Sequence, residues 1–366
     1  MIKLYLRILV VRWKIYGFSA VFFSWLLGEP ILRAFNRLMW VLDRWLFPGF
    51  MQVEVKNPIF IMGHPRSGTT FLHQVLAKNE EAVLFPTWHL LFPALSARYL
   101  LRPLINWLIK TGKTEVLPAS TGHAIDLNAP EEEEMLFFNT YDTQFVAAGL
   151  LGFDDAEYPE LQWNDQQPDH RRFRSMEFLH GCFQRQIYAT GRHQIIAQMH
   201  FSTHRLKTMM QYYPDAKFIY MLRNPYAVVP SFLSLLHASI DHQWGLSNIP
   251  TAQLMRYNQR RYRAMVALYR YFYDLQQNKE IPENRVLVLP YSLLRNHLTV
   301  AIDKIVAFTG MPVSEHWHQT LIREAENQKH YHRQHQVKAL EDFGITPAQI
   351  AEDFKFVFDA YPIEAL

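Results

Sequence analysis

Residues 57–79, NPIFIMGHPRSGTTFLHQVLAKN, contain an apolar run, a turn with two glycines and an amphipathic stretch, in that order. Ile59 to Met62 predict a buried strand. A helix is indicated by four apolar residues at helical spacing, Phe71, Leu72, Val75 and Leu76. A strand, a glycine turn and a helix in succession form a site for a phosphate-like anion. We therefore expect an α/β fold with a P-loop-like parallel β-sheet flanked by helices.

The turn between this strand and helix is rich in hydrogen-bond donors. Gly63 and Gly68 allow backbone conformations that are closed to other residues, so successive amides can point at one oxyanion. Arg66 offers a planar fork suited to a tetrahedral oxyanion. The full set of predicted anion-binding residues in the turn is His64, Pro65, Arg66, Ser67, Gly68, Thr69 and Thr70.

The turn differs from the usual nucleoside-triphosphate loop at one position. Both glycines match that pattern, but its lysine is replaced by Thr69. Because that lysine neutralises the β- and γ-phosphates, the turn is poorly equipped for γ-phosphoryl transfer and adequate for a smaller terminal group.

A second strand-to-helix junction carries another candidate anion site. The apolar run 217–222 is followed by Arg223, and Ser231 lies eight residues further on. A guanidinium and a hydroxyl at such a junction can reach one phosphate monoester.

Together the two motifs resemble those of sulfotransferases that use 3′-phosphoadenosine 5′-phosphosulfate (PAPS), particularly the bacterial-type family with an RSGTT core. The resemblance implies that the first turn binds the 5′-phosphosulfate and that Arg223 and Ser231 bind the 3′-phosphate. It extends approximately from residue 57 to residue 345, and it implies PAPS as the sulfuryl donor with no metal.

Two positions depart from the family pattern. Tyr291 follows a third predicted strand and could pack near the adenine, but the acidic pair that many relatives carry after it is absent. Gln198 stands where many relatives have a lysine that balances charge on the sulfuryl group. Either a nearby cation compensates or turnover is slow or absent, and the candidate cations are His200, Arg205 and Lys207.

Residues 121–138 hold the best candidates for a general base. His123 titrates near neutrality, and by resemblance Glu132 or Glu133 faces the acceptor. The alternative is structural: Asn128 and Glu131 match a capping box, with the glutamates as solvated caps.

Other histidines are candidates for catalysis or for binding a phosphate or a metal. His64 and His89 could reach the sulfuryl group, or merely bond to the backbone. The segment 330–335, HYHRQH, resembles a lid over the nucleotide in which Lys329, His330 or Arg333 lies near phosphate. Metal binding by this segment is disfavoured, because no acidic or cysteine partner accompanies it. The predicted catalytic set is His123, Glu132, Glu133, Arg66 and His64.

The N-terminal fifty residues mix apolar, aromatic and basic side chains. Their uncharged run, 15–28, is shorter than the ~20 residues needed to span a bilayer. No small-residue cleavage site follows it cleanly, so a signal peptide is disfavoured. We expect interfacial helices at a membrane surface; the alternatives are helices that pad the core or form a homodimer face.

Charge and cysteine content bound the setting. The net charge of +3 suits anionic ligands or lipid headgroups and does not argue for nucleic acid. Arg256, Arg260 and Arg263 are better explained as the outer face of a packed helix. Cys182 is the only cysteine, which favours a reducing, cytoplasmic setting, and the residue is most simply a small core side chain. Together with the expected interfacial helices, this predicts a protein at the inner face of the membrane.

We therefore expect three regions: amphipathic helices in 1–55, a PAPS-binding α/β core in 56–310 with an acceptor-pocket insert at about 91–167, and a helical tail or lid in 311–366. The expected reaction is sulfuryl transfer to a hydroxyl of a lipid-like, glycolipid or other amphipathic alcohol, with a soluble small molecule or glycan less favoured. The alternatives are a P-loop kinase and a noncatalytic nucleotide-binding protein at the membrane.

Overall fold

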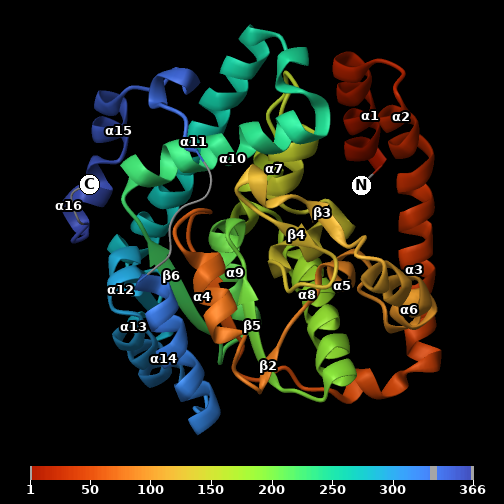
Figure 1. Ribbon diagram of the computed structural model, residues 1–366, viewed down its shortest axis with the longest axis vertical. Coiled ribbons are helices and arrows are strands. Elements are labelled where there is room, and N and C mark those ends of the chain that lie inside the picture. The colour runs from red at the N-terminus through yellow and green to blue at the C-terminus, as the bar shows by residue number, and fades with distance from the viewer. Residues whose placement is uncertain (1, 330–335, 364–366) are drawn as a thin grey trace. The chain divides into compact units, whose positions relative to one another are not determined.

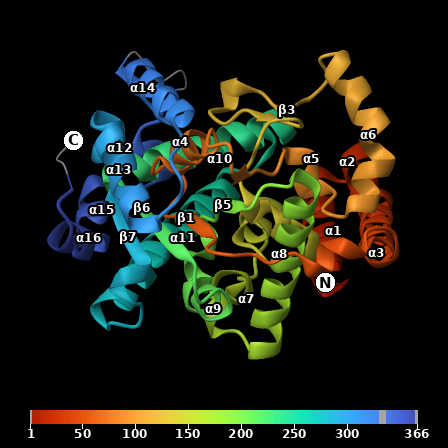
Figure 2. The same cartoon turned by 90° about the horizontal axis from the view of Figure 1, so that it is seen from below.

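Five parallel strands form the sheet that carries the predicted turns in this computed structural model, which describes residues 2–329 and 336–363 (Figure 1). The strands are β1 (Ile59–Met62), β2 (Ala82–Val83), β5 (Gln194–Gln198), β6 (Lys217–Leu222) and β7 (Val286–Pro290). Their order is β2-β5-β1-β6-β7, with every neighbouring pair parallel. Figure 2 labels β5, β1, β6 and β7 of this sheet. Central strands covered on both faces explain the continuous apolar runs in the sequence. The predicted α/β fold is confirmed.

The chain divides into two compact units, each built from three stretches. Unit 1 comprises Met1–Val55, Phe85–Leu117 and Ile125–Arg192. Unit 2 comprises Lys56–Leu84, Pro118–Ala124 and His193–Leu366, and it contains the five-stranded sheet. The N-terminal segment thus belongs to the same unit as residues 85–117.

Helices of unit 2 pack on the sheet through one apolar core. Leu72, Ile302 and Trp317 belong to this core together with Ile61 of β1, and Trp317 Nε1 donates to the Val75 carbonyl at 3.4 Å. This core takes residues from α4 (Thr69–Leu76), α12 (Tyr291–Asn296), α13 (Leu298–Thr309) and α14 (Glu315–Lys329). The unit also contains α9 (Leu206–Tyr212), α10 (Pro225–Trp244), α11 (Thr251–Gln277), α15 (Pro347–Asp353) and α16 (Lys355–Ala360). Short 3-10 turns are η3 (Ala119–Thr121), η7 (Phe201–Arg205), η8 (Leu246–Asn248), η9 (Glu283–Arg285) and η10 (Leu340–Phe343).

The long helix α11 buries its aromatic residues. Tyr257, Tyr262, Tyr269 and Phe272 are all buried on it, and Tyr262 donates to Asp353 Oδ2 at 2.8 Å. This confirms the packed-helix interpretation of the basic and aromatic stretch. Residues 338–353 are held against α10 and α11, since Lys338 N also donates to Ser234 Oγ at 2.9 Å.

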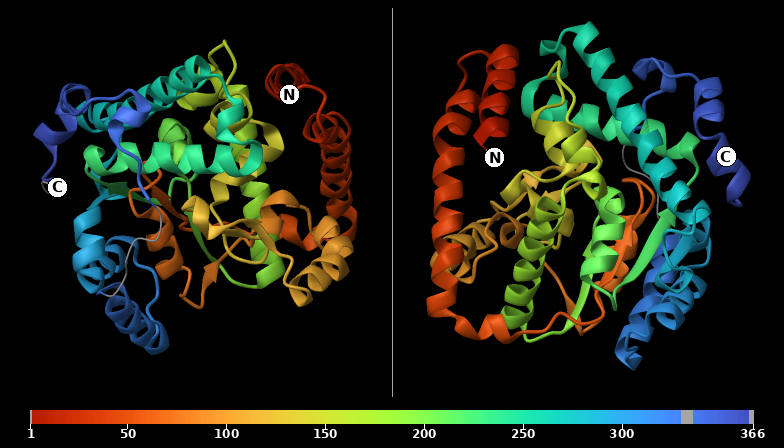
Figure 3. Two further views of the ribbon diagram at one scale, coloured as in Figure 1. Left: turned by 45° about the horizontal axis from the view of Figure 1, so that its top comes forward. Right: turned by 180° about the vertical axis from the view of Figure 1, so that it is seen from behind.

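Unit 1 is mostly helical and irregular. It contains α1 (Ile2–Tyr16), α2 (Ala20–Phe23), the π-helix η1 (Ser24–Gly28), α3 (Glu29–Leu46), the 3-10 helix η2 (Pro48–Gln52), α5 (Thr87–Leu91), α6 (Leu95–Lys110), α7 (Pro159–Gln162) and α8 (Asp169–Thr190). Between these lie the hairpin of β3 (Glu115–Leu117) and β4 (Ile125–Asp126), and the turns η4 (Glu133–Thr140), η5 (Val146–Leu150) and η6 (Asn164–Gln166). Figure 3 shows the N-terminal helices in red.

A buried ion pair joins three helices of this unit. Asp43 on α3 accepts from the Leu95 and Ser96 amides at 2.9 and 2.7 Å, at the start of α6. Arg185 on α8 donates its Nε to Asp43 at 2.6 Å and lies between the rings of Trp40 and Phe50. Asp43 therefore supplies the cap that α6 lacks in its own sequence.

The region predicted to be amphipathic, residues 1–55, contains α1, α2, η1, α3 and η2 among the residues that the structure describes. Their packing is partly internal, because the Tyr5 hydroxyl of α1 donates to the Leu26 carbonyl at 2.9 Å. Within residues 2–329 and 336–363, no helix is both long enough and apolar enough to cross a membrane.

Candidate functional site

The predicted anion loop lies between β1 and α4 in unit 2. Its two glycines have left-handed backbones, with φ of +118° at Gly63 and +90° at Gly68. A Cβ on Gly63 would lie 2.4 Å from the Met221 carbonyl oxygen of β6, so the loop fits against the neighbouring strand only with glycine there. Gly68 immediately precedes α4, and its carbonyl accepts from Leu72 N at 3.0 Å. The loop amides thus lie at the positive end of a helix.

Arg66 connects this loop to the second predicted motif. Its Nε donates to Ser231 Oγ on α10 at 3.1 Å, and its carbonyl accepts from Arg223 Nη1 at 2.6 Å. Arg66 itself has φ of +75°, in the left-handed region that disfavours side chains. The contacts therefore hold a strained loop conformation and bring both motifs together.

The second motif follows β6, the strand next to β1. Arg223 comes directly after this strand, and Asn224 caps α10 by accepting from Tyr226 N at 2.9 Å. Ser231 is buried on the same helix. Because β1 and β6 run parallel, the loops at their carboxyl ends meet at one edge of the sheet, where α/β proteins bind ligands.

Tyr291 lies against both motifs. It begins α12 directly after β7, and a Cβ on Gly68 would meet its ring at 2.7 Å. The Arg223 guanidinium carbon lies 4.1 Å from the centre of the same ring. The aromatic face therefore supports the cation and closes one side of the loop.

Gln198 ends β5, on the other side of β1. Its Nε2 donates to Thr70 Oγ1 at 3.2 Å and lies 2.7 Å from His200 Nε2. His200 Nδ1 lies 3.2 Å from the Gly63 carbonyl and 3.4 Å from Thr69 Oγ1. Since a carbonyl only accepts, Nδ1 carries a proton in that bond, which leaves Nε2 to accept from Gln198.

Comparison with known proteins decides the family of this chain. The model of the sulfotransferase family matches residues 58–315, which include both anion motifs, Gln198 and Tyr291. This chain belongs to the sulfotransferase family.

Two curated relatives of this sulfotransferase carry the same name, omega-hydroxy-beta-dihydromenaquinone-9 sulfotransferase Stf3, from Mycobacterium tuberculosis and Mycobacterium bovis. Each is 25% identical over 204 residues, which is 52% of this chain and 47% of the relative. The chain thus spans about half the length of these relatives.

Solved structures show the same fold. Sulfotransferase STF1 of Mycobacterium tuberculosis superposes with a TM-score of 0.67 at 17% identity, covering 96% of this chain and 91% of that one. Sulfotransferase STF9 of Mycobacterium avium gives 0.68 at 18% identity, covering 90% of this chain and 83% of that one. At such low identity the likeness establishes the fold alone.

Within the sulfotransferase, His123 lies in unit 2 on a short segment tied to the anion loop. Arg66 Nη1 donates to the carbonyl of Gly122, the residue before His123, at 3.1 Å. Thr121 Oγ1 donates to the His123 carbonyl at 3.2 Å and closes a tight turn. His123 is half-buried. The structure therefore brings this candidate base into the neighbourhood of the loop.

The four consecutive glutamates 131–134 belong to unit 1, and all of them are buried. Glu134 accepts from Thr143 Oγ1 at 3.0 Å, and the 3-10 helix here begins at Glu133 without a side-chain cap. The capping-box interpretation with solvated glutamates is therefore wrong. Glu132 and Glu133 belong to unit 1 and His123 belongs to unit 2. A catalytic role for either glutamate together with His123 stays a prediction.

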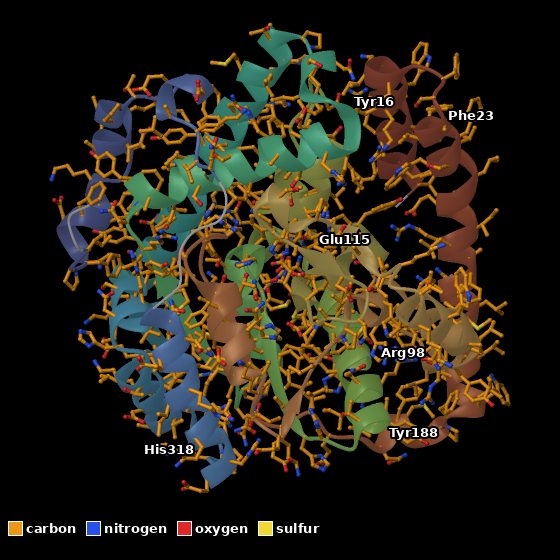
Figure 4. The ribbon with its side chains drawn as sticks, viewed as in Figure 1. Tyr16, Phe23, Arg98, Glu115, Tyr188 and His318 are labelled. Atoms are coloured by element: carbon orange, nitrogen blue, oxygen red, sulfur yellow. The ribbon has the colours of Figure 1, made fainter. Side chains whose placement is uncertain are left out.

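His64 and His89 are poor proton acceptors as the structure has them. Burial lowers the pKa of His64 to about 3, and its Nδ1 donates to the Pro65 carbonyl at 2.7 Å. Burial, with Arg98 nearby, lowers the pKa of His89 to about 2, and its ring bonds to Gln186 at 3.1 Å within unit 1. Arg98, labelled in Figure 4, donates to the same Gln186 oxygen.

The remaining candidates are placed as follows. Of the three proposed substitutes for the family lysine, His200 contacts the loop, Lys207 forms an exposed ion pair with Glu280 at 2.7 Å, and Arg205 is buried in η7. Lys329 is the last residue of α14, whereas Arg333 and the rest of 330–335 lie outside the described residues. Cys182 is buried, and desolvation raises the pKa of its thiol to about 12, as expected of a core residue.

Tyr269 is a contact that sequence reasoning missed. Its hydroxyl donates to the Arg223 carbonyl at 3.1 Å, and its ring stacks on His64 at 5.9 Å between centroids. The residue is on α11, far along the chain from both motifs, and its only signal is an aromatic residue on the buried face of a long helix.

Proposed function

We propose that this sulfotransferase moves a sulfuryl group from PAPS to an acceptor hydroxyl. The observation that carries the proposal is the junction of the two anion motifs, in which Arg66 bonds to Ser231 and to Arg223. A glycine loop alone accepts many phosphates, but a second cationic site one strand away suits a nucleotide with charged groups at both its 5′ and 3′ positions.

In this proposal each motif has one role. The loop residues His64 to Thr70 bind the 5′-phosphosulfate through backbone amides, the hydroxyls and Arg66. Arg223 and Ser231 bind the 3′-phosphate, and Tyr291 packs near the adenine. Lys329 and Arg333 stay predicted contributors from the C-terminal segment.

Sulfuryl transfer is a direct in-line displacement. The acceptor oxygen forms a bond to sulfur while the bond from sulfur to the bridging phosphate oxygen breaks, and 3′-phosphoadenosine 5′-phosphate (PAP) leaves with that electron pair. The acceptor proton passes to the base. The loop amides and Arg66 stabilise the charge that develops on the leaving phosphate, so no metal is needed.

His123 is the proposed base, with Glu132 or Glu133 assisting. Its attachment through Gly122 to Arg66 supports this role, since a base must lie beside the sulfuryl group. Burial keeps the pKa of His64 at about 3, which argues against that histidine as the proton acceptor and favours a structural role in the loop.

His200 is proposed to replace the family lysine. Its ring lies beside Thr69 and bonds to the Gly63 carbonyl and to Gln198, so it stands in for the lysine through hydrogen bonds at the loop.

We propose a lipid-like or other amphipathic alcohol as the acceptor. One support is the name of the two relatives, which describes a sulfotransferase for a hydroxylated menaquinone derivative. The other is the aromatic insert at 91–167. The cytoplasmic setting expected from the cysteine content stays a prediction.

The test is calorimetry of PAP, ADP and ATP binding to the wild type, Arg66→Ala and Arg223→Ala. We expect selective PAP binding, weakened about 10- to 100-fold by each substitution, because each removes a charge-assisted hydrogen bond. Arg192→Ala is the control, since Arg192 precedes the amino end of β5 and not the carboxyl edge.

The outcomes separate the alternatives. Preference for ATP, or strict dependence of activity on magnesium, would favour a kinase. PAP binding without turnover on any hydroxyl acceptor would favour a noncatalytic nucleotide-binding protein.

A further inference from the structure

The helices α1, α3 and α6 of unit 1 expose large apolar side chains along their outer faces. On α3 the exposed fractions are 68% for Ile31, 56% for Leu38, 49% for Val41 and 80% for Trp45. These positions recur at three- to seven-residue spacing, so they form one stripe on the helix. The opposite face of α3 carries the buried Asp43.

Two further helices of unit 1 also expose large apolar residues. Leu100, Leu104 and Trp107 are exposed on α6, which is bonded to α3 through Asp43. Leu6 and Trp13 are exposed on α1. Figures 1 and 2 show α1, α3 and α6 on the same side of unit 1, and Phe23 is labelled beside α2 in Figure 4. We call the outer sides of these three helices the helical apolar face.

Every exposed charged residue on these helices is positive. Among residues 2–46 and 91–113 the exposed charged residues are Lys3, Lys14, Arg37, Arg44, Arg102, Lys110 and Lys113. The two acidic residues in these ranges are occupied: Glu29 is half-buried and bonds to Arg33 at 2.5 Å, and Asp43 is buried with Arg185. The face thus combines apolar area, tryptophan and uncompensated positive charge, as helices at a membrane interface do.

We propose that the helical apolar face inserts shallowly into an anionic lipid surface. This inference deepens the proposed function and rests on it for the substrate class, because a lipid-like acceptor resides in such a surface. Arg37 and Arg44 would meet lipid phosphates while Leu38, Val41 and Trp45 enter the acyl boundary.

A second copy of this chain fits the face less well. A two-fold interface brings identical patches together, so the arginines and lysines of one copy would face those of the other. An anionic lipid surface supplies the opposite charge.

The test is co-sedimentation of the full chain with vesicles of roughly equal parts phosphatidylglycerol and phosphatidylcholine, and with phosphatidylcholine vesicles alone. We expect binding to the anionic vesicles. Arg37→Gln/Arg44→Gln should lower the partition coefficient about 25-fold, at about fivefold per charge. Leu38→Ser/Trp45→Ser should lower it by about tenfold or more.

The control is Val300→Ser/Lys304→Gln, which makes the same two kinds of change at exposed positions of unit 2. It should bind like the wild type, and thermal melting shows whether each variant is folded. Folded wild type that does not bind, or double variants that bind like wild type, would overturn the proposal. A dimer that both double variants disrupt, without vesicle binding, would overturn it in favour of a second copy.

Binding of PAP in the absence of vesicles keeps this test separate from the proposed function. A variant that loses vesicle binding but keeps PAP affinity supports the lipid surface. A wild type that binds vesicles but does not prefer PAP would instead contradict the proposed function alone.

Discussion

At the scale of single residues, Arg66 determines the loop conformation from both its backbone and its side chain. Its φ is +75°, its carbonyl accepts from Arg223, and its guanidinium bonds to Ser231 and to the Gly122 carbonyl. A strained backbone persists only where several contacts fix it, and such strain is concentrated at functional sites.

The backbone strain at Arg66 can be separated from the role of its side chain. Arg66→Gly and Arg66→Ala both remove the guanidinium, but only glycine adopts positive φ freely. We expect the glycine variant to be more stable than the alanine variant by about 1 kcal/mol, and both to lose PAP affinity to the same extent. Denaturant melts and calorimetry measure the two effects. Equal stability of the two variants would show that the backbone of Arg66 is not strained.

Gly63 is expected to be irreplaceable because of its neighbour. Gly63→Ala would bring its Cβ to 2.4 Å from the Met221 carbonyl oxygen, where β1 and β6 pair, and should destabilise the fold by about 3 kcal/mol or more. Gly17→Ala is the matched control, because Gly17 has φ of +60° with no atom within 4 Å of its added Cβ. The control should lose about 1 kcal/mol, from φ alone. Thermal melting distinguishes the two, and similar losses would argue against the close approach.

Sequence reasoning located Arg66, Arg223 and Ser231 because they belong to short motifs of fixed spacing. It did not foresee the bond from Arg66 to Gly122 or the support of Arg223 by Tyr269. Those contacts join segments that no local pattern relates, so only the folded chain reveals them.

At the scale of elements, the carboxyl end of β5 distinguishes this chain from the family pattern. Gln198→Lys would place a cation beside Thr70 and should raise PAP affinity by about tenfold while destabilising the nucleotide-free protein by about 1–3 kcal/mol, since a buried ammonium is poorly solvated. Gln194→Lys, at the amino end of the same strand, is the control and should leave PAP affinity unchanged.

Calorimetry measures both affinities, and melting measures the stability. An unchanged affinity of the Gln198→Lys variant would contradict the view that this edge of the sheet lacks a charge. It would show instead that the hydrogen bonds of Gln198 and His200 already serve in place of the lysine.

The second prediction at this scale concerns the ion pair between Asp43 on α3 and Arg185 on α8. Asp43→Ala should lower the free energy of unfolding by about 3–5 kcal/mol, because it leaves Arg185 charged and buried and also uncaps α6. Asp43→Leu/Arg185→Met should be less destabilising than Asp43→Ala, since no charge is then stranded. Urea denaturation provides both values. A double variant less stable than the single one would show that the remaining contacts of Arg185, with the Gly181 and Trp40 carbonyls, outweigh the cost of its unpaired charge.

At the scale of the whole molecule, the buried histidines lead us to expect that the free energy of unfolding falls in acid. Desolvation lowers the pKa of His64 and His204 to about 3 and that of His89 to about 2. Unfolding restores a pKa near 6.5, so between these values the unfolded chain binds more protons and stability falls as the pH falls. Above pH 7 the effect is absent.

We expect a loss of up to about 1.4 kcal/mol per histidine for each pH unit between pH 6 and pH 5, where carboxylates contribute little. Denaturant midpoints at pH 5, 6 and 8 measure the slope. His204→Gln should reduce that slope by about one fifth to one third, because burial also lowers the pKa of His180 and His237. Equal stability at pH 5 and pH 8 would show that the histidines are solvated.

The sheet was predictable from the sequence, whereas most of unit 1 was not. Buried parallel strands leave continuous apolar runs, and these marked Ile59–Met62 and Lys217–Leu222 directly. In unit 1, residues 133–166 instead form short 3-10, π and α-helical turns, and glutamates 131–134 are buried. Their conformation depends on tertiary contacts, so local propensity predicted a helix cap where the structure has none.

The order of the strands has a consequence for the protein during its synthesis. β1 leaves the ribosome early, yet both of its neighbours, β5 and β6, lie more than a hundred residues later in the chain. An apolar strand whose partners are still untranslated is exposed to wrong pairing, and long-range parallel pairing is slow. The nascent chain therefore cannot acquire its anion loop before residue 222 has emerged, and a chaperone that shields residues 59–62 until then would raise the yield of native protein.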